Sequence, residues 1–244
     1  MKTIGVIPSR YASKRFPGKP LVEIEGKTMI QRVYEQACRA KLLSEVIIAT
    51  DDRRIYDHAR AFGAQVMITS TNHYTGTDRC AEVATRYQDM EAILNIQGDE
   101  PFIDPQQIDL LSSYLRNEEE VDIATLAKEI TEPEPVFDPN TVKVVFNKAG
   151  RALYFSRSPI PYLNGVEKKE WLLKGRFYKH IGIYGFRRQT LLEITRFSRS
   201  RLEKMESLEQ LRWLDNGYEI GIQLTDQETI GIDTPEDLKK LTDH

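Results

Sequence analysis

The residues best suited to chemistry begin with four cationic side chains in one short loop, at Arg10, Lys14, Arg15 and Lys19. The loop follows an apolar run at residues 3–8, which lacks alternation and is therefore typical of a central parallel strand covered on both faces. A basic loop at the carboxyl end of such a strand is well placed to bind a polyphosphate. A solvated charged loop is the alternative, and a short basic motif alone does not exclude it.

Two aspartates far apart in the sequence are candidate metal ligands. Asp99 follows Gly98 directly after an apolar strand at 92–96, and Mg²⁺ accepts one or two carboxylates together with phosphate oxygens. Asp233 precedes Thr234, which is expected to cap a helix, so the Asp233 carboxylate would stay outside that helix. Unless the fold brings the two aspartates together, each is explained equally well as a residue that orders a turn or a helix cap.

The charges of these groups favour a nucleoside triphosphate as the ligand. Arg10, Arg15 and Lys19 with one Mg²⁺ carry a formal charge of about +5, against about −4 for a triphosphate and about −1 for a carboxylate on a second substrate. The sequence contains no GxxxxGK[ST], so this is not a P-loop enzyme, and no GxGxxG follows the first strand, so dinucleotide binding is unsupported. Side-chain forks and loop amides must then position the phosphates.

Length and composition set the limits within which this site must form. With 244 residues the chain is long enough for one large core, and residues 1–244 are expected to form a single domain. Lys and Arg number 34 and Asp and Glu 37, so no global field would attract nucleic acid or an anionic membrane. No run of 18 apolar residues occurs, and Cys38 and Cys80 lack metal-ligand spacing. These features predict a cytoplasmic protein without membrane insertion, with both cysteines as buried thiols.

Strands alternate with helices through the first half of the chain. Helices are predicted at 28–40, 53–62, 77–87 and 105–116, between strands at 3–8, 46–50, 66–69 and 92–96. Thr28 and Gln31 have the spacing of a capping box at the first helix. The alternation predicts an α/β fold, a doubly wound three-layer sheet that is mostly parallel.

The second half of the chain has a different pattern. Strands are predicted at 123–128, 142–146, 152–156, 180–186 and 219–224, with helices at 206–216 and 234–241. The turn at 147–150 joins two of these strands into a hairpin, so this half of the sheet is expected to be mixed or antiparallel. Residues 157–176 contain prolines and a charged run, which favours a mobile loop.

The chain resembles the 3-deoxy-manno-octulosonate (Kdo) cytidylyltransferases through blocks spread over nearly its whole length. These blocks are IPSRYASKRFPGKPL at 7–21, ATDD at 49–52, TGTDR at 75–79, NIQGDEPFI at 95–103, ALYFSRSPIPY at 152–162, KHIGIYGFR at 179–187, SLEQLRWLDNG at 207–217 and GIDTPEDL at 231–238. The first block alone would admit other sugar nucleotidyltransferases, including CMP-sialic acid synthetases. The blocks at 152–162 and 179–187 separate this family from them.

The resemblance implies a nucleotide-diphospho-sugar transferase-like fold and an enzyme that activates Kdo with CTP, giving CMP-Kdo and pyrophosphate for lipopolysaccharide biosynthesis. It also implies a homodimer, with a smaller sugar-binding and dimerisation lobe within about residues 123–200. The cofactor would be Mg²⁺. A second metal ion could lower the pKa of the attacking sugar hydroxyl, so no essential general base is expected.

The resemblance also assigns residues by position. The triphosphate would be held by Arg10, Arg15 and Lys19. The cytidine would be surrounded by Pro8, Ser9, Gly76, Arg79 and Gln97. The metal would bind Asp99 and Asp233, and the sugar acid would contact Arg157, His180, Tyr184, Glu209 and Gln210. Catalysis would rest on Arg10, Lys19, Asp99 and Asp233.

Other interpretations stay open at this point. A glycosyltransferase on a similar sheet would use a nucleotide sugar as donor, and a non-catalytic regulator would bind CTP without turnover. The sequence does not separate Kdo from a close variant such as an amino-substituted one. Without the resemblance, His180 would be a structural histidine, and Glu209 and Gln210 would be solvated helix residues. Ser9 and Lys14 stand where the family often has alanine and threonine.

Overall fold

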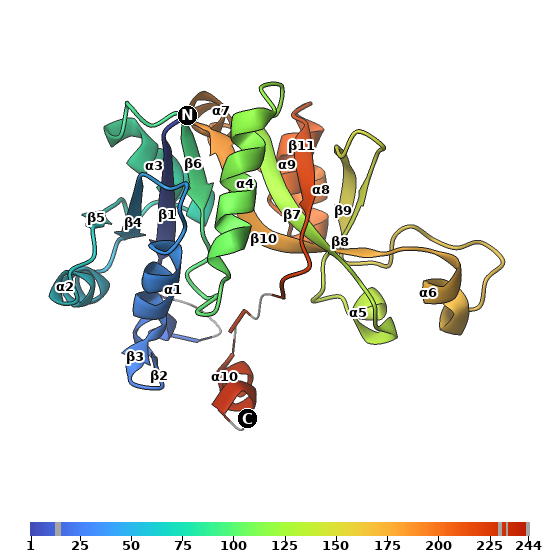
Figure 1. Cartoon of the computed structure of the whole chain (residues 1–244), viewed down its shortest axis with the longest axis horizontal. Coiled ribbons are helices and arrows are strands. Elements are labelled where there is room, and N and C mark those ends of the chain that lie inside the picture. The colour runs from blue at the N-terminus through green and yellow to red at the C-terminus, as the bar shows by residue number, and fades with distance from the viewer. Residues whose placement is uncertain (13–15, 229–230, 233, 243–244) are drawn as a thin grey trace.

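The computed structural model describes residues 1–12, 16–228, 231–232 and 234–242, the last four without their side chains. Within these residues a mixed sheet of nine strands forms the centre of the molecule (Figure 1). Its strands are β1 (Thr3–Ser9), β4 (Glu45–Thr50), β5 (Val66–Ile68), β6 (Ala92–Asn95), β7 (Ile123–Glu129), β8 (Lys143–Phe146), β9 (Ala152–Ser156), β10 (Tyr178–Arg187) and β11 (Ile220–Leu224). A separate hairpin joins β2 (Glu23–Ile24) to β3 (Lys27–Thr28).

The helices lie between and beyond these strands. They are α1 (Met29–Ala37), α2 (Arg53–Ala61), α3 (Gly76–Arg86), α4 (Pro105–Asn117), α5 (Pro133–Phe137), α6 (Trp171–Lys174), α7 (Arg188–Ile194), α8 (Arg201–Glu206), α9 (Gln210–Asp215) and α10 (Pro235–Thr242), with 3-10 turns at Lys19–Leu21 and Lys168–Glu170. No helix among the described residues is both long and apolar enough to cross a bilayer.

The strand order is β11-β7-β10-β6-β1-β4-β5. Strands β6, β1, β4 and β5 are parallel neighbours, whereas β10 runs antiparallel to both β6 and β7. The hairpin predicted around 147–150 is present as β8 and β9. The prediction of a doubly wound, mostly parallel sheet with a mixed second half is therefore confirmed.

Two apolar cores cover the two faces of the sheet. One contains residues of α1, α2 and α4, and the other contains residues of α3, α7 and α9. Figure 1 shows α1 and α4 in front of the sheet. β1 is buried along nearly its whole length, as expected for a strand with a helix layer on each side. A third, smaller cluster around Trp171 packs between α5 and α6, which project at the right of Figure 1. A sugar-binding and dimerisation role for this region stays a prediction.

Several local predictions were wrong. Thr28 lies at the N-cap of α1, but its hydroxyl shares a 2.8 Å hydrogen bond with His58 Nε2, so no capping box forms. Cys38 is exposed, and only Cys80 is a buried thiol. Residues 168–174 are helical, since Trp171 is buried between Phe137 and Phe177. The mobility expected for 157–176 stays a prediction.

The helix predicted at 206–216 is interrupted. Ser207 adopts a left-handed conformation with a φ of 53°, which ends α8, and Glu209 is the N-cap of the short helix α9. The apolar period continues across the break, so periodicity alone did not reveal it. Helix α8 was missed although Ser200 and Glu203 form a capping box at its start.

Gly185 of β10 tests how tightly α4 packs on the sheet. A Cβ atom at this position would lie 2.6 Å from Leu115 Cδ1 and 3.3 Å from Leu111 Cγ. Gly185→Ala is therefore expected to lower the free energy of unfolding by about 1–3 kcal/mol, measured by urea denaturation. Gly231→Ala is the control, because a Cβ there meets no atom of the described residues within 4 Å. Equal stability of the two variants would contradict this packing.

Candidate active site

A cavity of about 330 Å³ opens where β1 and β6 end. The described residues that line it are Pro8, Ser9, Arg10, Ala12, Lys19, Pro20, Tyr74, Gly76, Arg79, Gln97, Gly98 and Asp99. Ligands of open α/β sheets bind at this edge, outside the carboxyl ends of the strands. The structure therefore brings together the described residues that were predicted to hold the nucleotide.

Close backbone contacts form the floor of this cavity. A Cβ atom on Gly98 would lie 2.9 Å from the Pro8 carbonyl oxygen, and one on Gly76 would lie 3.0 Å from Pro8 Cγ. The loops after β1 and β6 and the start of α3 thus approach more closely than side chains would allow. Any larger residue at Gly98 would have to move the backbone of β1.

The basic loop after β1 is tied to the loop after β6. Lys19 Nζ donates a 2.7 Å hydrogen bond to Asp99 Oδ2, and both side chains are at least partly buried. Within the basic loop, the Gly18 amide donates to the Tyr11 carbonyl oxygen at 2.9 Å, with Gly18 at a φ of 74°. The guanidinium of Arg54 lies over the Tyr11 ring at 3.3 Å. The bond from Gly18 to Tyr11 brings the two ends of the basic loop side by side.

Two predicted site residues, Arg15 and Asp233, lie outside the described residues. Their assigned roles stay predictions. The described residue before Asp233 does reach this corner, because the Ile232 amide donates to the Asp99 carbonyl oxygen at 2.9 Å. Thr234 caps α10 as predicted, since its hydroxyl accepts a hydrogen bond from the Asp237 amide.

Arg79 is a fully buried cation at the back of the cavity. Its Nη1 donates to the Thr69 hydroxyl, and its Nη2 forms a 3.1 Å ion pair with Asp51. Burial lowers the pKa of Arg79, Asp51 opposes that shift, and the nearby charge of Arg10 adds to it. Asp51 was not predicted as a site residue, although its place after β4 was the available signal. It keeps the buried guanidinium paired.

Several buried polar atoms at this edge have no hydrogen-bond partner within the described residues. They are Ser9 Oγ, Arg10 Nη2, Arg79 Nε, Asn95 Oδ1 and Tyr184 Oη. Buried polar groups in folded proteins are almost always paired. Because Ser9, Arg10 and Arg79 line the cavity, their unpartnered atoms indicate a place for a polar ligand. Asn95 was missed as a site residue. It lies at the end of β6 between Val6 and Tyr184, a position that only strand pairing reveals.

Strand β10 supplies the next wall of the site. Its pairing with β7 is irregular between Ile181 and Tyr184, and the Gly182 carbonyl there accepts a 2.9 Å hydrogen bond from Gln97 Nε2. Strand irregularities of this kind often lie beside active sites, where they redirect side chains. Here the irregularity joins Gln97 of the nucleotide cavity to the strand that carries His180 and Tyr184.

His180 and Tyr184 pack against each other with ring centroids 5.2 Å apart. His180 Nε2 lies 3.0 Å from the Thr125 hydroxyl, and burial lowers the pKa of His180 to about 3. The imidazole is therefore neutral near pH 7. For Tyr184 the effect of burial is the opposite, because burial raises the pKa of its hydroxyl, and the charge of Glu209 adds to that upward shift. Tyr184 and Glu209 therefore lie close enough for their charges to interact.

The remaining predicted sugar ligands come from outside the sheet's centre. Gln210 is 5% exposed at the start of α9, beside the half-buried Glu209. Neither is a solvated helix residue. Arg157 donates from Nε to the Glu206 carbonyl at 2.7 Å and from Nη1 to the Pro139 carbonyl at 3.0 Å. Two guanidinium donors thus contact backbone, and the predicted fork toward a sugar carboxylate stays a prediction.

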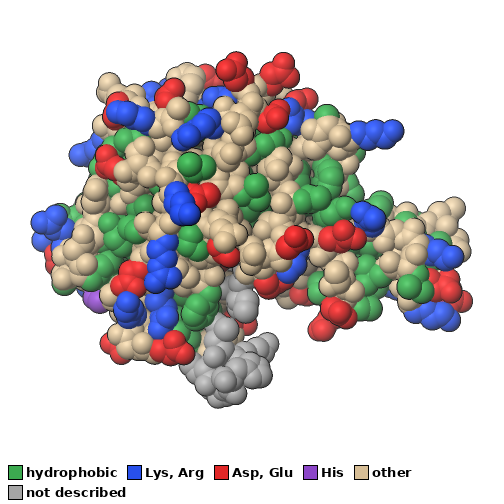
Figure 2. Space-filling view, viewed as in Figure 1, with side chains coloured by type: hydrophobic (Ala, Val, Ile, Leu, Met, Phe, Trp, Pro, Cys, Tyr) green, Lys and Arg blue, Asp and Glu red, His purple; other side chains and the backbone are tan. Residues whose placement is uncertain are grey.

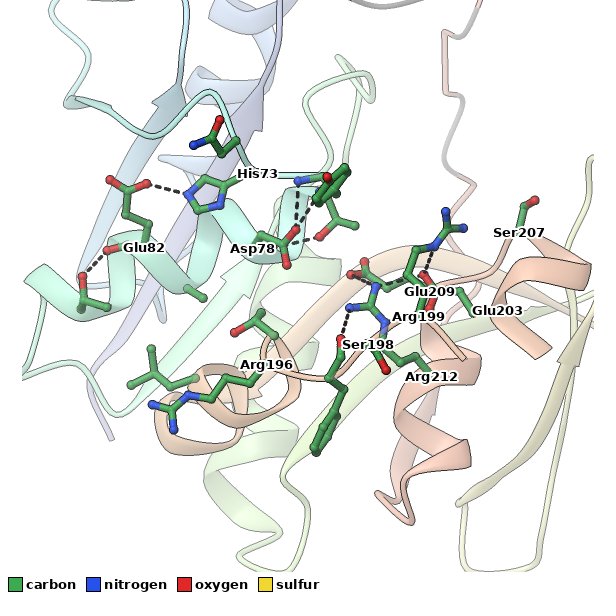
Figure 3. Close-up of a pocket in the computed structure, with 18 residues that line it drawn as sticks. His73, Asp78, Glu82, Arg196, Ser198, Arg199, Glu203, Ser207, Glu209 and Arg212 are labelled. Atoms are coloured by element: carbon green, nitrogen blue, oxygen red, sulfur yellow. Dashed lines mark hydrogen bonds and ion pairs between the residues drawn. The ribbon is translucent and has the colours of Figure 1, made fainter. Parts of the chain in front are cut away.

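A larger cavity of about 1100 Å³ lies between α3 and the segment from α7 to α9 (Figure 3), and Tyr74 lines both this cavity and the smaller one. Several of its charged side chains pair with one another. His73 lies 2.6 Å from Glu82, and Arg212 bonds to Glu203 and Glu209. None of the unpartnered buried atoms found in the described residues belongs to its lining. The smaller cavity is therefore the better candidate for chemistry.

The donor set around Asp99 bears on metal binding. Among the described residues, no three His, Cys, Asp or Glu side chains converge on one point. A site formed by one or two carboxylates and ligand phosphates needs no such cluster, and that is the usual form for Mg²⁺. The Asp99 carboxylate lines the cavity beside the basic loop, so it fits this role.

Glu100, next to Asp99, is turned into the protein. It is 8% exposed, and its Oε2 has no hydrogen-bond partner among the described residues. Burial raises the pKa of Glu100 to about 8, the charge of Asp99 adds to the shift, and Lys179 opposes it. The folded protein therefore holds a proton on Glu100 that the unfolded chain releases above its ordinary pKa.

The proton on Glu100 gives a pH-dependent stability. Because its pKa is higher in the folded state, its contribution favours folding at low pH and is lost as the pH rises from about 4.5 to about 8. Glu100→Gln is expected to remove a slope of up to about 1.4 kcal/mol per pH unit in this window, measured by urea denaturation. The exposed Glu119 is the control position, as Glu119→Gln. Parallel profiles for Glu100→Gln and wild type would contradict the assignment.

Comparison with known proteins agrees with this geometry. A family profile described as "Cytidylyltransferase" matches residues 4–223. A 3-deoxy-manno-octulosonate cytidylyltransferase of Parabacteroides distasonis is 53% identical over 245 residues, which cover 98% of this chain and 96% of the relative. Its counterpart in Bacteroides thetaiotaomicron is 51% identical over 243 residues, with coverage of 98% and 96%.

Solved structures give the same result. A CMP:2-keto-3-deoxy-manno-octonic acid synthetase complexed with CTP has a TM-score of 0.92 at 42% identity, covering 99% of this chain and 97% of the other. A 4-diphosphocytidyl-2C-methyl-D-erythritol synthase from Anaerococcus prevotii has a TM-score of 0.62 at 15% identity, and the match covers 98% of this chain and 96% of that chain. At this identity the likeness shows a shared fold alone. With close relatives that align over almost their full length, the chain belongs to the 3-deoxy-manno-octulosonate cytidylyltransferase family.

Proposed function

We propose that the protein transfers the cytidylyl group of CTP to Kdo, giving CMP-Kdo and pyrophosphate for lipopolysaccharide synthesis. The observation that carries the proposal is that Ser9, Arg10 and Arg79, whose buried polar atoms include some without a partner among the described residues, line the strand-end cavity of a chain in this family. Cations for phosphates line the cavity at Arg10, Lys19 and Arg79, and Gln97 joins it to β10, the strand that carries Tyr184.

The nucleotide half of the site follows from the cavity lining. Arg10 and Lys19, with Arg15, would bind the triphosphate, and the cytidine would lie among Pro8, Ser9, Gly76, Arg79 and Gln97. The Kdo anomeric hydroxyl attacks the α-phosphorus, a new P–O bond forms, and the bond to pyrophosphate breaks. Lys19 already contacts an anionic oxygen, that of Asp99, so a modest side-chain movement would bring its charge to the leaving pyrophosphate.

Asp99, together with Asp233, would hold Mg²⁺. When bound, this metal would supply positive charge that offsets the charge of the phosphates, and a second metal ion would lower the pKa of the attacking hydroxyl. Support comes from the Asp99 carboxylate in the cavity and from the contact of Ile232 with the Asp99 backbone. Lys19, which donates a hydrogen bond to Asp99, would compete with the metal for this carboxylate.

The sugar acid would lie beyond the α-phosphate, against β10 and α9. Tyr184 and Gln210 offer buried polar groups there, and His180, neutral at pH 7, offers a nitrogen that donates or accepts according to its tautomer. Glu209 and Arg157 complete the proposed set. We also propose a cytoplasmic homodimer, with the α5–α6 projection and its apolar cluster as the dimerisation lobe.

Pyrophosphate release tests the function. The protein with Mg²⁺ is expected to release pyrophosphate from CTP and Kdo, and much less with other nucleoside triphosphates or with sialic acid. Asp99→Asn should lower kcat by about 10²–10³, because it removes a carboxylate that would hold Mg²⁺ and thereby weakens the positive charge at the phosphates. Asp89→Asn is the control, since Asp89 forms a comparable aspartate–lysine pair with Lys2 on the surface, at 3.2 Å. CTP binding without turnover in wild type would instead favour a non-catalytic regulator.

His180 is not expected to act as a general base. Its lowered pKa leaves the imidazole a weak base, so the kcat profile between pH 6 and 8 should contain no step that depends on it. His180→Gln should raise the KM for Kdo and leave the shape of that profile unchanged. His58→Gln, which alters a similar histidine–threonine contact on α2, should change neither. Loss of an acidic limb in His180→Gln would show that the histidine is a base after all.

A further inference from the structure

A buried network of charged side chains supports Glu209 from behind. Arg212 on α9 donates to both carboxylate oxygens of Glu203 on α8, from Nε at 2.9 Å and from Nη2 at 3.0 Å. The same Nη2 donates to Glu209 Oε1 at 3.2 Å. The other oxygen of Glu209 accepts a 2.8 Å hydrogen bond from the Thr77 hydroxyl on α3. Figure 3 shows the Glu203, Glu209 and Arg212 side chains turned toward one another.

The network is almost closed to solvent. The side chains of Arg212 and Glu203 are 5% and 4% exposed, and Thr77 is 1% exposed, whereas Glu209 is 24% exposed. Only the last member therefore reaches open space. A bidentate pair between a guanidinium and a carboxylate has a defined geometry, so it fixes the position of Arg212 and of the nitrogen that contacts Glu209.

Glu209 needs this support because of its place in the chain. It follows the break between α8 and α9 and is the N-cap residue of α9, a helix of six residues that offers little rigidity of its own. Its surroundings also disfavour the ionised form of its carboxyl group. Burial raises its pKa and Asp78 adds to the shift, while the bonds from Thr77 and Thr75 and the charge of Arg212 lower the pKa.

We propose that Arg212 and Thr77 are positioning residues that hold the Glu209 carboxylate in the orientation in which it binds the sugar acid. Thr77 lies between Gly76 and Arg79, which line the nucleotide cavity, so the network also links α3, on the nucleotide side, to α9, on the sugar side. The inference rests on the proposed function, because Glu209 is a sugar ligand only within it. A purely structural role, tying α8 to α9, is the competing explanation for Arg212.

Thr77→Val gives the sharpest test, because valine keeps the shape and removes only the donor to Glu209. The KM for Kdo is expected to rise about tenfold, as for a lost hydrogen bond to a charged group, while the KM for CTP changes less than about twofold. Thr77→Ser, which restores the hydroxyl, should recover the wild-type KM. Arg212→Lys should raise the KM for Kdo as well, since lysine lacks the fork that contacts both glutamates.

The pH dependence of Kdo affinity is a second measurement, and a purely structural role would leave it unchanged. Removing the Thr77 donor raises the pKa of Glu209, so the loss of Kdo affinity on the acid side should begin at a higher pH in Thr77→Val than in wild type. The other groups that face Glu209 are Arg212 on its own helix, Thr75, Asp78 and Cys80 near the start of α3, and Tyr184 on β10. The valine substitution leaves all of them in place.

Tyr218→Phe is the matched control. It removes a hydroxyl that donates to a glutamate, Glu193, at 2.9 Å, outside the proposed site. Its KM values and pH profile should equal those of wild type, and melting temperatures should be recorded for every variant. A wild-type protein that releases no pyrophosphate would refute the proposed function. An active wild type in which Thr77→Val behaves like Tyr218→Phe, or raises both KM values alike, would refute the positioning role.

Discussion

The structure depends on the close approach of the loops that follow β1 and β6. These two strands are hydrogen-bonded neighbours at the centre of the sheet, and the ion pair between Lys19 and Asp99 joins their loops at 2.7 Å. The approach is possible because Gly98 has no side chain where it meets the Pro8 carbonyl. A cationic loop and a carboxylate 80 residues apart in sequence thereby share one corner.

Charge is arranged locally in this protein. The net charge is only −3, and acidic and basic side chains are interspersed over the face shown in Figure 2. Inside, buried cations are matched by defined partners, Arg79 by Asp51 and Arg212 by Glu203. Removing one member of such a pair leaves an uncompensated buried charge, which is costly. The pair with Asp51 therefore fixes Arg79 in the wall of the smaller cavity, and the pair of Arg212 with Glu203 fixes part of the wall of the larger one.

Regular elements were the easiest part to predict. Buried parallel strands and long amphipathic helices such as α4 have strong periodic signals, and the predicted helix start at residue 105 agrees with α4, which Asp104 caps and Pro105 begins. Short elements were harder. Helices α5 to α8 have five, four, seven and six residues, too few for a clear period, and they exist because tertiary packing holds them. Family resemblance, not periodicity, identified the described site residues on β10 and α9.

The sequence by itself determined the alternation of strands and helices, the cationic loop after the first strand and the family, because each is encoded in residues close together in the chain or in blocks in a set order. Only the tertiary structure decided which of these residues meet. Asn95 became a site residue through its pairing with Val6 and Tyr184, and Asp51 through its contact with Arg79. The support of Glu209 by Thr77 spans 132 residues. Contacts of this range depend on strand order and helix packing, which local patterns do not specify.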